Sequence, residues 1–417
     1  EASGWMMTLS ERGAIPVVGW REHAVPDIGA PGKLTERRAA VALVLGAEIG
    51  HGAERVAVER ARVRQAFGSH VWFNDAMARG EQERERECFF AGNGPPGPAS
   101  GAVGQSAASD TVLAFPRSAP LTATALGRWA NCAFQGFVAH ALGVRAESPT
   151  DDAPDPRARG ILLHRLLELL FRELMKDGTW PPGFEPARVD ALIEHALEGA
   201  LGQLAKTQSL GHPALVGLLK QEARRAARRV LALALEATGT VGGPPSKVGG
   251  TPSEVELHFG DERAAPALRE VALVQGDEGD VVFVAGAIDR VDEGPEGLFV
   301  IDYKTTAPKR ARAREALLTT EFQLPLYLYA LQQSGRRIHD AAWLSLRDGQ
   351  LLRLSQLEGV DIHTLVTQEL PSTVLSLRRR LREGVWEPAS HDCGRCDFST
   401  VCRISADAKK ARKESTV

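Results

Sequence analysis

The segment GAIDRVDEGPEGLFVIDYKT, residues 286–305, sets the architecture of this protein. Its centre, Glu293–Gly297, combines glycine, proline and acidic residues, a composition typical of a tight turn between two strands. A hairpin centred between Pro295 and Glu296 places Asp289 opposite Asp302, since both lie the same number of steps from that point. The segment therefore predicts an antiparallel hairpin with two acidic residues side by side at one end.

The second strand of this hairpin carries a lysine beside its aspartate. Side chains alternate between the faces of a strand, so Asp302 and Lys304 share one face and Tyr303 points the other way. Directly opposed side chains have Cβ atoms about 4.5–5.5 Å apart, and two such carboxylates repel unless a cation lies between them. Mg²⁺ prefers hard oxygen ligands of this kind. Lys304 would orient or deprotonate a metal-bound water, or neutralise a phosphate.

An Asp-x-Lys sequence is also compatible with an exposed ion pair on a surface hairpin. The apolar runs at 281–284 and 298–301 favour a different interpretation, in which both strands are central and buried. A buried aspartate needs a partner or a metal ion.

Composition describes an ordinary globular protein. The chain has 417 residues, 43% of them hydrophobic and 25% charged, which suits two or three domains. The net charge of −3 argues against a uniformly basic DNA-coating surface. No run of about 18 apolar residues and no secretion signal is present, so we expect a cytoplasmic protein without membrane contact. Because residue 1 is Glu rather than Met, we expect a piece of a longer polypeptide.

Four of the five cysteines suggest a metal site rather than disulfides. Cys393, Cys396 and Cys402 lie close together in sequence, and Cys132 lies far upstream. A Cys-x-x-Cys sequence alone suits zinc, iron–sulfur or redox chemistry. His391 is the local alternative for a fourth ligand, and it would make a zinc site.

The remaining pattern alternates helices and strands, which indicates an α/β protein. Gly- and Pro-rich connectors are expected at 91–110 and 238–253. Helices are predicted at 122–142, 161–176, 187–206, 213–237, 315–333 and 371–383, and strands at 254–259, 281–291, 298–305, 341–346 and 350–354.

Four sequence motifs occur in an order that resembles a known family. They are GILLHRLLE at 160–168, GAIDRVD at 286–292, DYKT at 302–305 and QLPLY at 323–327. This set resembles the RecB-type branch of the PD-(D/E)XK nuclease superfamily. With the four cysteines added, residues 118–405 resemble the nuclease domain of AddB-type subunits, which carries a [4Fe–4S] cluster.

The resemblance implies a role for each matching residue. His164, Asp289, Asp302 and the carbonyl of Tyr303 become ligands of Mg²⁺ (or Mn²⁺), and Lys304 becomes the catalytic lysine. Cys132, Cys393, Cys396 and Cys402 become the cluster ligands.

Further site residues follow from the same resemblance. Gln323 and Tyr327 match a Gln-x-x-x-Tyr helix beside the DNA path, and at i and i+4 they share one helix face. Glu256 is the candidate for an additional acidic residue on the preceding strand, with Glu254 as second choice.

Each of these assignments has a simpler alternative. His164 is compatible with a packed or solvated residue, Tyr327 with a core residue, and Cys132 with a buried thiol. Glu168 is expected to pair with Arg172 on the helix surface, outside the site.

The resemblance also implies an architecture and an activity. We expect a restriction-endonuclease-like core, a central mixed sheet flanked by helices, at 111–405. An α-rich remnant of a helicase-like region plus linker is expected at 1–110, and a disordered basic tail at 406–417. The implied activity is metal-dependent exonuclease cleavage of DNA in double-strand-break repair, on single-stranded ends and with a larger helicase–nuclease partner subunit. The alternative is a non-catalytic DNA-binding scaffold that retains the fold and the cluster.

Overall fold

The structure is a computed structural model that describes much of the chain beyond residue 70. The ranges described are 71–90, 97–102, 118–144, 156–176, 186–207, 212–237, 250–274, 281–306, 308–386 and 396–399. The structure also describes residues 61, 65, 69, 94, 95, 104, 180, 393 and 402. The predictions for residues 1–60, for the basic tail and for His391 lie outside the described residues.

The chain divides into two compact units, Glu1–Gly94 and Pro95–Val417. The first contains the helix α4 (Val71–Phe90), and the second contains the central sheet and the helices around it. Whether a helicase-like remnant ends near residue 110 stays a prediction.

A five-stranded mixed sheet forms the centre of the second unit. Its strand order is β1-β4-β5-β6-β7, and every neighbouring pair is antiparallel except β5 with β6, which is parallel. The expected α/β class with a central mixed sheet is confirmed, and it is consistent with a restriction-endonuclease-like core. The strands are β1 (Thr251–Phe259), β4 (Gly286–Gly294), β5 (Gly297–Lys304), β6 (Ile338–Ser345) and β7 (Leu351–Arg353).

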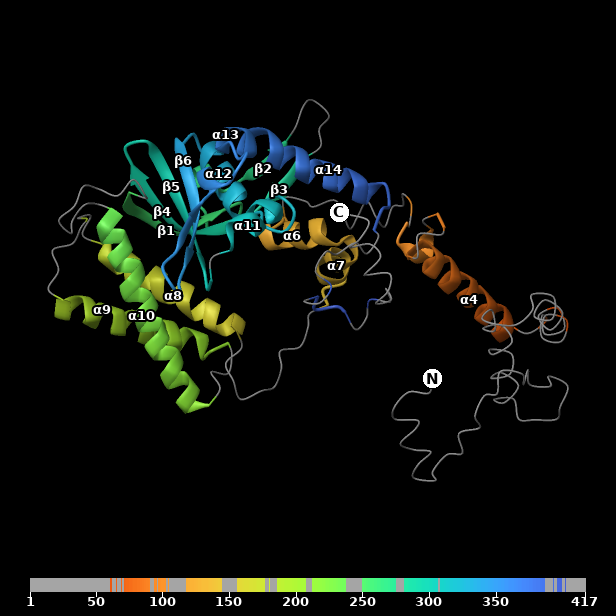
Figure 1. Ribbon diagram of the computed structural model, residues 1–417, viewed down its shortest axis with the longest axis horizontal. Helices are drawn as coiled ribbons and strands as arrows, with labels where there is room; N and C mark the ends of the chain where they lie inside the picture. The colour runs from red at the N-terminus through yellow and green to blue at the C-terminus, as the bar shows by residue number, and fades with distance from the viewer. Residues whose placement is uncertain are drawn as a thin grey trace, which may run out of the picture. The chain divides into compact units, whose positions relative to one another are not determined.

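One face of this sheet is covered by three long helices, α8 (Pro156–Leu174), α9 (Pro186–Leu204) and α10 (Pro213–Ala237) (Figure 1). Phe299 and Ile301 of β5 pack into the same core as the leucines of α8. The intervening residues, Leu298 and Val300, belong to the core on the other face. β5 is therefore buried on both sides, as its continuous apolar run predicts.

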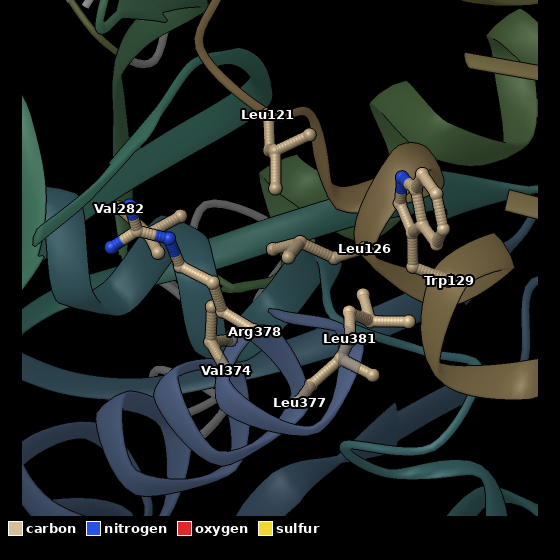
Figure 2. A pocket seen from close by; sticks show the side chains of 8 residues that line it. All are labelled: Leu121, Leu126, Trp129, Val282, Val374, Leu377, Arg378 and Leu381. Carbon is tan, nitrogen blue, oxygen red and sulfur yellow. The ribbon is translucent and has the colours of Figure 1, made fainter. Parts of the chain in front are cut away.

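The opposite face is covered by α6 (Ala123–Asn131), α12 (Gln323–Gln333), α14 (Leu370–Arg382) and a two-stranded sheet. Figure 2 shows where α6, α14 and the small sheet meet, around Leu126, Val282 and Leu381. The space between them is about 10 Å³, at the lower limit for a single water molecule, so it is a packing gap rather than a ligand site.

The remaining elements are shorter, and β2 and β3 among them form the two-stranded sheet. They are η1 (Pro98–Ser100), α7 (Ala133–Gly136), η2 (Phe137–Ala141), η3 (Pro266–Leu268), β2 (Val271–Val274), β3 (Val281–Val284), α11 (Arg310–Ala316), η4 (Leu354–Gln356), α13 (Ile362–Thr364) and η5 (Leu365–Glu369).

The predicted hairpin forms in the predicted register. Gly294 pairs with Gly297 around a turn at Pro295 and Glu296, and the pairing continues to Arg290 with Ile301. One further step along both strands reaches Asp289 and Asp302. The hairpin thus brings the two aspartates to neighbouring positions.

Two predicted helices are interrupted. The helix predicted at 122–142 breaks at Cys132, whose backbone is extended with φ −161° and ψ 115°, so α6 ends there and α7 begins. The helix predicted at 315–333 is also two helices, because a turn at Leu317–Phe322 separates α11 from α12.

The strand predicted at 281–291 is two strands in different sheets. Val281–Val284 pairs with β2 in the small sheet, and Gly286 begins β4 of the central sheet. The backbone of Leu121 causes the separation, since it donates to Phe283 O at 2.8 Å and accepts from Ala285 N at 3.0 Å.

The arginines of α10 connect the helices of the bundle. Arg224 forms an ion pair with Glu194, and Arg228 forms one with Asp190, both on α9. In the part of the chain that the structure describes, no helix is both long and apolar enough to cross a membrane.

Candidate active site

Asp302, near the end of β5, is fully buried and poorly satisfied. Neither of its carboxylate oxygens has a hydrogen-bond partner among the described residues, and the nearest cation, Lys304 Nζ, lies 3.2 Å from Oδ2 as an ion pair. Burial raises the pKa of Asp302 to about 7, with Lys304 acting against that rise and Asp289 adding to it. Buried oxygens without donors are costly, so this carboxylate fits a site that is completed by a cation.

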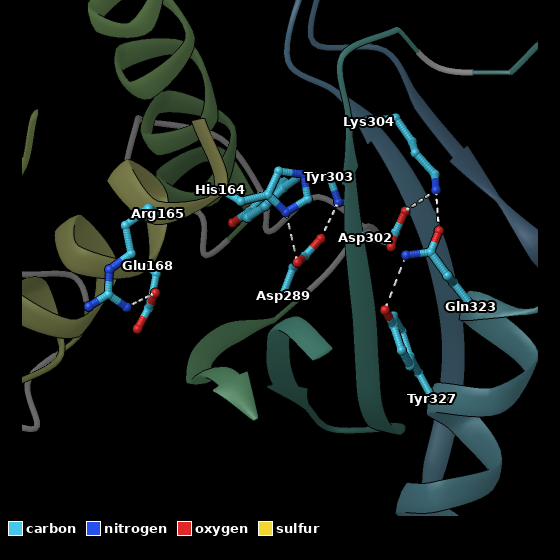
Figure 3. Close-up of polar contacts among 9 residues, drawn as sticks. All are labelled: His164, Arg165, Glu168, Asp289, Asp302, Tyr303, Lys304, Gln323 and Tyr327. Carbon is cyan, nitrogen blue, oxygen red and sulfur yellow. Dashed lines mark hydrogen bonds and ion pairs between the residues drawn. The ribbon is translucent and has the colours of Figure 1, made fainter. Parts of the chain in front are cut away.

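Asp289 lies beside Asp302 but makes different contacts (Figure 3). Its Oδ1 lies 3.0 Å from His164 Nδ1, and its Oδ2 accepts a hydrogen bond from Tyr303 N at 2.7 Å. The backbone pairing of the hairpin ends one step earlier, so the carboxylate takes the place of a strand partner for Tyr303 N. The contacts with His164 and with Tyr303 N therefore fix the orientation of the Asp289 carboxylate.

The strand β4 is irregular at this position. Ile288 and Val291 are three residues apart, yet both pack into the core on the α12 side. The regular alternation of side chains is therefore interrupted between them, at Asp289. In the register of β1 with β4 the opposite residue is Glu256, whose backbone has the unusual φ of 47°. Such backbone irregularities cluster at functional sites.

His164 comes from α8 and approaches the hairpin from the other side. Its ring meets the Tyr303 ring edge-on, with centroids 5.9 Å apart, and its side chain is 36% exposed. Burial lowers the pKa of His164, but Asp289 outweighs that effect and raises it to about 9. In the absence of a metal ion, His164 and Asp289 therefore form an imidazolium–carboxylate pair.

Lys304 contacts three residues of the site. Its Nζ lies 3.2 Å from Asp302 Oδ2 and 3.6 Å from Glu321 Oε2, and it donates to Gln323 Oε1. Burial lowers the pKa of Lys304, but Asp302 and Glu321 outweigh this and the pKa is raised. The side chain is therefore a fixed ammonium ion.

Gln323 and Tyr327 share one face of α12, as predicted. Gln323 Nε2 donates to the Tyr327 hydroxyl at 3.2 Å while its Oε1 accepts from Lys304 (Figure 3). Tyr327 is also a core residue, packed edge-on against Phe259 with centroids 6.0 Å apart. The structure thus links the helix α12 to the lysine by a chain of side-chain hydrogen bonds.

The two candidate acidic residues of β1 have different surroundings. Burial raises the pKa of Glu256, and the negative charges of Glu168 and Asp289 add to that rise. In the register of β1 with β4, Glu256 lies opposite Asp289. Glu254 forms an ion pair with Arg336 instead. The surroundings favour Glu256, the first choice, as a member of the site.

Comparison with known proteins identifies the family. Residues 120–403 match the family model of the PD-(D/E)XK nuclease superfamily. This chain belongs to the PD-(D/E)XK nuclease superfamily. The hairpin with Asp289, Asp302 and Lys304 lies inside the matched region.

Two further similarities are weaker. Over 220 residues the chain is 26% identical to the B subunit of the ATP-dependent helicase/deoxyribonuclease of Moorella thermoacetica, and the match covers 52% of this chain and 18% of that protein. The chain thus spans less than a fifth of that relative. A solved structure titled "Crystal structure of SSO0001" is 14% identical over 58% of this chain and 85% of its own, with a TM-score of 0.24, too low to support an argument.

The donor atoms in this nuclease-superfamily site suit a hard divalent ion. Carboxylate oxygens are the ligands that Mg²⁺ and Mn²⁺ prefer, and Asp302 offers one oxygen without a polar partner and one that faces Lys304. Among the described residues, no three His, Cys, Asp or Glu side chains converge on one point, because Asp289 turns toward His164 and Asp302 toward Lys304. Joint coordination of an ion by these residues stays a prediction.

The four cysteines are placed in two groups. Cys132 is buried at the break between α6 and α7. Backbone hydrogen bonds connect the segment of the other three cysteines: Cys396 N donates to Cys393 O at 3.3 Å, and Cys402 N donates to Phe398 O at 2.9 Å. Burial raises the pKa of the Cys396 thiol. Four thiols suit an iron–sulfur cluster or zinc.

Three features of the site were missed by the sequence analysis. Glu168 pairs with Arg172 at 2.7 Å, as predicted, but it is buried rather than on the surface, and its charge raises the pKa of Glu256. Its spacing of four residues from His164, one helical turn, is a signal that could have revealed it. Glu321 gave no local signal, because its contact with Lys304 depends on the turn before α12.

The third missed feature is a buried ion pair behind the site. Arg290 donates to both carboxylate oxygens of Asp292, at 2.8 and 3.0 Å. Its guanidinium also lies 4.8 Å from the centre of the Phe171 ring and 3.4 Å from the Tyr303 hydroxyl. An Arg-x-Asp sequence on one strand, with both residues on the same face, is the signal that could have predicted it.

Proposed function

We propose that this chain is a nuclease that uses Mg²⁺ (or Mn²⁺) to hydrolyse DNA phosphodiester bonds, in the manner of an exonuclease. The observation that carries this proposal is Asp302, a buried carboxylate without a hydrogen-bond donor beside a fixed ammonium ion. Degradation of end-labelled linear DNA tests it. We expect degradation with Mg²⁺ and none with EDTA, and equal degradation in both would contradict the proposal.

Asp289, Asp302, His164 and the Tyr303 carbonyl would hold the metal ion. When bound, the ion would polarise the scissile phosphate and lower the pKa of a bound water molecule. Asp302 is already desolvated, and Tyr303 N already orients Asp289. Joint binding of the ion would require Asp289 to turn from His164, and Asp302 from Lys304, toward the metal. Glu256 would add a third carboxylate from β1.

Lys304 would act as a cation rather than as a base. Its raised pKa keeps it protonated, which suits stabilisation of the negative charge that develops on the phosphate or orientation of the attacking water. Gln323 would position Lys304, and Gln323 with Tyr327 would form the wall along which the DNA strand runs.

Replacing Lys304 with glutamine is expected to lower kcat for DNA cleavage by about 10²–10³, because one preorganised cation is lost. The measurement is single-turnover cleavage with saturating enzyme, and Lys309→Gln, at an exposed lysine before α11, is the control. Equal rates for both variants would contradict the assignment of Lys304.

We further propose a role in double-strand-break repair, as an AddB-like subunit that acts on single-stranded ends with a larger helicase–nuclease partner. The supports are the superfamily and the name of the Moorella relative, which is called a helicase/deoxyribonuclease. Copurification with a large ATPase tests this role, and a fully active chain that binds no such partner would contradict it.

Cys132, Cys393, Cys396 and Cys402 would bind a [4Fe–4S] cluster with a structural role. The cluster would hold the α6–α7 junction against the C-terminal segment. Closing a loop of about 260 residues removes about 5 kcal/mol of chain entropy from the unfolded state. The cluster would therefore act as a cross-link between these two distant segments of the chain.

Replacing Cys396 with serine is expected to remove the brown colour and to lower the thermal stability of the whole nuclease unit. Visible absorbance, iron and zinc analysis and thermal unfolding are the measurements, and Cys88→Ser, at an exposed cysteine of the first unit, is the control. Stoichiometric zinc without iron, or full stability of the iron-free protein, would contradict the cluster.

A further inference from the structure

A polar cavity of about 280 Å³ lies next to Lys304, on the side of the site where α6 approaches α12. One wall is the side of α6 and α7, with Thr124, Arg128, Asn131 and Gln135. The other wall is the turn before α12 and its first residue, including Glu321 and Gln323. Both of these last residues contact Lys304, so the cavity and the candidate active site share a wall.

A glycine explains why α6 lies so close to the turn. A Cβ atom at Gly127 would collide with the backbone oxygen of Thr320, which cannot move aside as a flexible side chain could. Only glycine therefore allows the two walls to approach at this point. Arg128, the next residue, is thereby held at the cavity beside the site.

The chemistry of the walls favours an anionic, hydrogen-bonding ligand. Arg128 is partly buried and forms no ion pair with any carboxylate in the described part of the chain. Asn131 Nδ2 donates to Gln135 Oε1 at 3.2 Å, which orients the two amides along the same wall. The acidic group at the cavity, Glu321, lies 3.6 Å from Lys304, whose charge offsets its own.

A cation beside two amides and a hydroxyl is the pattern that binds a phosphate together with the polar edges of a nucleotide. The guanidinium of arginine binds phosphate oxygens in pairs, and amide side chains hydrogen-bond to sugars and bases. The cavity is too polar to be a gap in the core, unlike the apolar space of Figure 2.

We propose that this cavity is a substrate subsite, which holds the nucleotide next to the scissile phosphate of a single DNA strand, and that Arg128 binds the phosphate of that nucleotide. The inference rests on the proposed nuclease function and extends it, because it assigns substrate binding to α6. A strand bound there would pass Gln323 and reach Lys304 directly.

The test is the binding of a fluorescein-labelled oligothymidylate to Arg128→Gln, measured by anisotropy in Ca²⁺ over a series of KCl concentrations. Loss of one charged phosphate contact is expected to weaken binding about tenfold. It is also expected to reduce the slope of log affinity against log salt by about 0.7. Arg128→Lys should retain that slope, because it keeps the charge.

The matched control is Arg225→Gln, since Arg225 is exposed on α10, which packs on the opposite face of the sheet. It is expected to bind like the wild type. An unchanged affinity and slope in Arg128→Gln, or equal losses in both variants, would overturn the inference. Arg128→Gln should also unfold at the wild-type temperature, because Arg128 forms no ion pair among the described residues.

Binding and cleavage separate this inference from the proposed function. A wild type that cleaves DNA, with Arg128→Gln cleaving and binding equally well, would overturn the subsite alone. A wild type that never cleaves but loses affinity and slope on replacement of Arg128 would support the subsite and contradict the nuclease.

Discussion

Replacing Asp302 with asparagine is expected to abolish DNA cleavage and at the same time to stabilise the metal-free protein. The loss of a metal ligand should reduce kcat by about 10³ or more, since the metal contributes several kcal/mol to catalysis. Stability should rise because the substitution removes a buried charge whose desolvation the ion pair with Lys304 offsets only in part. Above pH 7 we expect the free energy of unfolding of the variant to exceed that of the wild type by about 1–3 kcal/mol.

The gain in stability should depend on pH in a defined direction. Burial raises the pKa of Asp302 to about 7 in the folded protein, above its ordinary value in an unfolded chain. Ionisation of Asp302 therefore destabilises the fold progressively as the pH rises from about 4 to about 7. The asparagine variant has no group that ionises at this position, so it does not lose stability in this way. Its free energy of unfolding should be close to that of the wild type below pH 4 and should exceed it by the full amount above pH 7.

Asp340 provides a matched control on the neighbouring strand β6. It is as buried as Asp302, but it accepts hydrogen bonds from Arg353 Nε at 2.8 Å and from Ser355 Oγ at 2.6 Å, among others. Asp340→Asn should lose about 3 kcal/mol of stability and retain cleavage. Chemical unfolding with EDTA measures both variants. An Asp302→Asn protein that cleaves normally, or that is less stable than the wild type, would contradict the role assigned to Asp302.

Replacing Arg290 with methionine is expected to cause the largest loss of stability, about 3–5 kcal/mol in the free energy of unfolding. The substitution would leave Asp292 buried without its partner, since Arg290 donates to both of its oxygens. The guanidinium also contacts Phe171 of α8, so the loss should loosen α8, the helix that carries His164. Denaturant unfolding measures the effect.

The double variant Arg290→Met with Asp292→Leu distinguishes a buried charge pair from simple packing. Apolar residues of similar volume often replace a buried ion pair without cost, so the double variant should recover most of the stability. If the single and double variants lose the same free energy, packing of the arginine stem is responsible, and the unpaired carboxylate of Asp292 is not the cause.

The hairpin was predictable because its signals are local. The turn composition at Glu293–Gly297 fixes the register, and the register places Asp289 and Asp302 one step beyond its last pair, Arg290 with Ile301. The helices α8, α9 and α10 were likewise predictable from their helical spacing of apolar residues. These elements need no information from distant parts of the chain.

The features of the fold and of the candidate site that were not predicted depend on contacts between distant segments of the chain. The chain leaves one sheet and enters the other at Ala285, because the backbone of Leu121 forms hydrogen bonds with Phe283 and Ala285. Leu121 lies more than a hundred residues away in the sequence. The contact of Glu321 with Lys304 depends on the turn before α12, where Leu318 has the unusual φ of 60°. The position of His164 beside Asp289 was expected only from the family resemblance, not from any spacing in the sequence.

Electron paramagnetic resonance of Mn²⁺ added to the full 417-residue chain would show whether Asp289 and Asp302 together bind one catalytic metal ion. We predict a bound Mn²⁺ signal in the wild type and in Asp340→Asn, and its loss in Asp289→Asn and in Asp302→Asn. Full Mn²⁺ binding by the double variant of Asp289 and Asp302 would contradict their joint role as metal ligands.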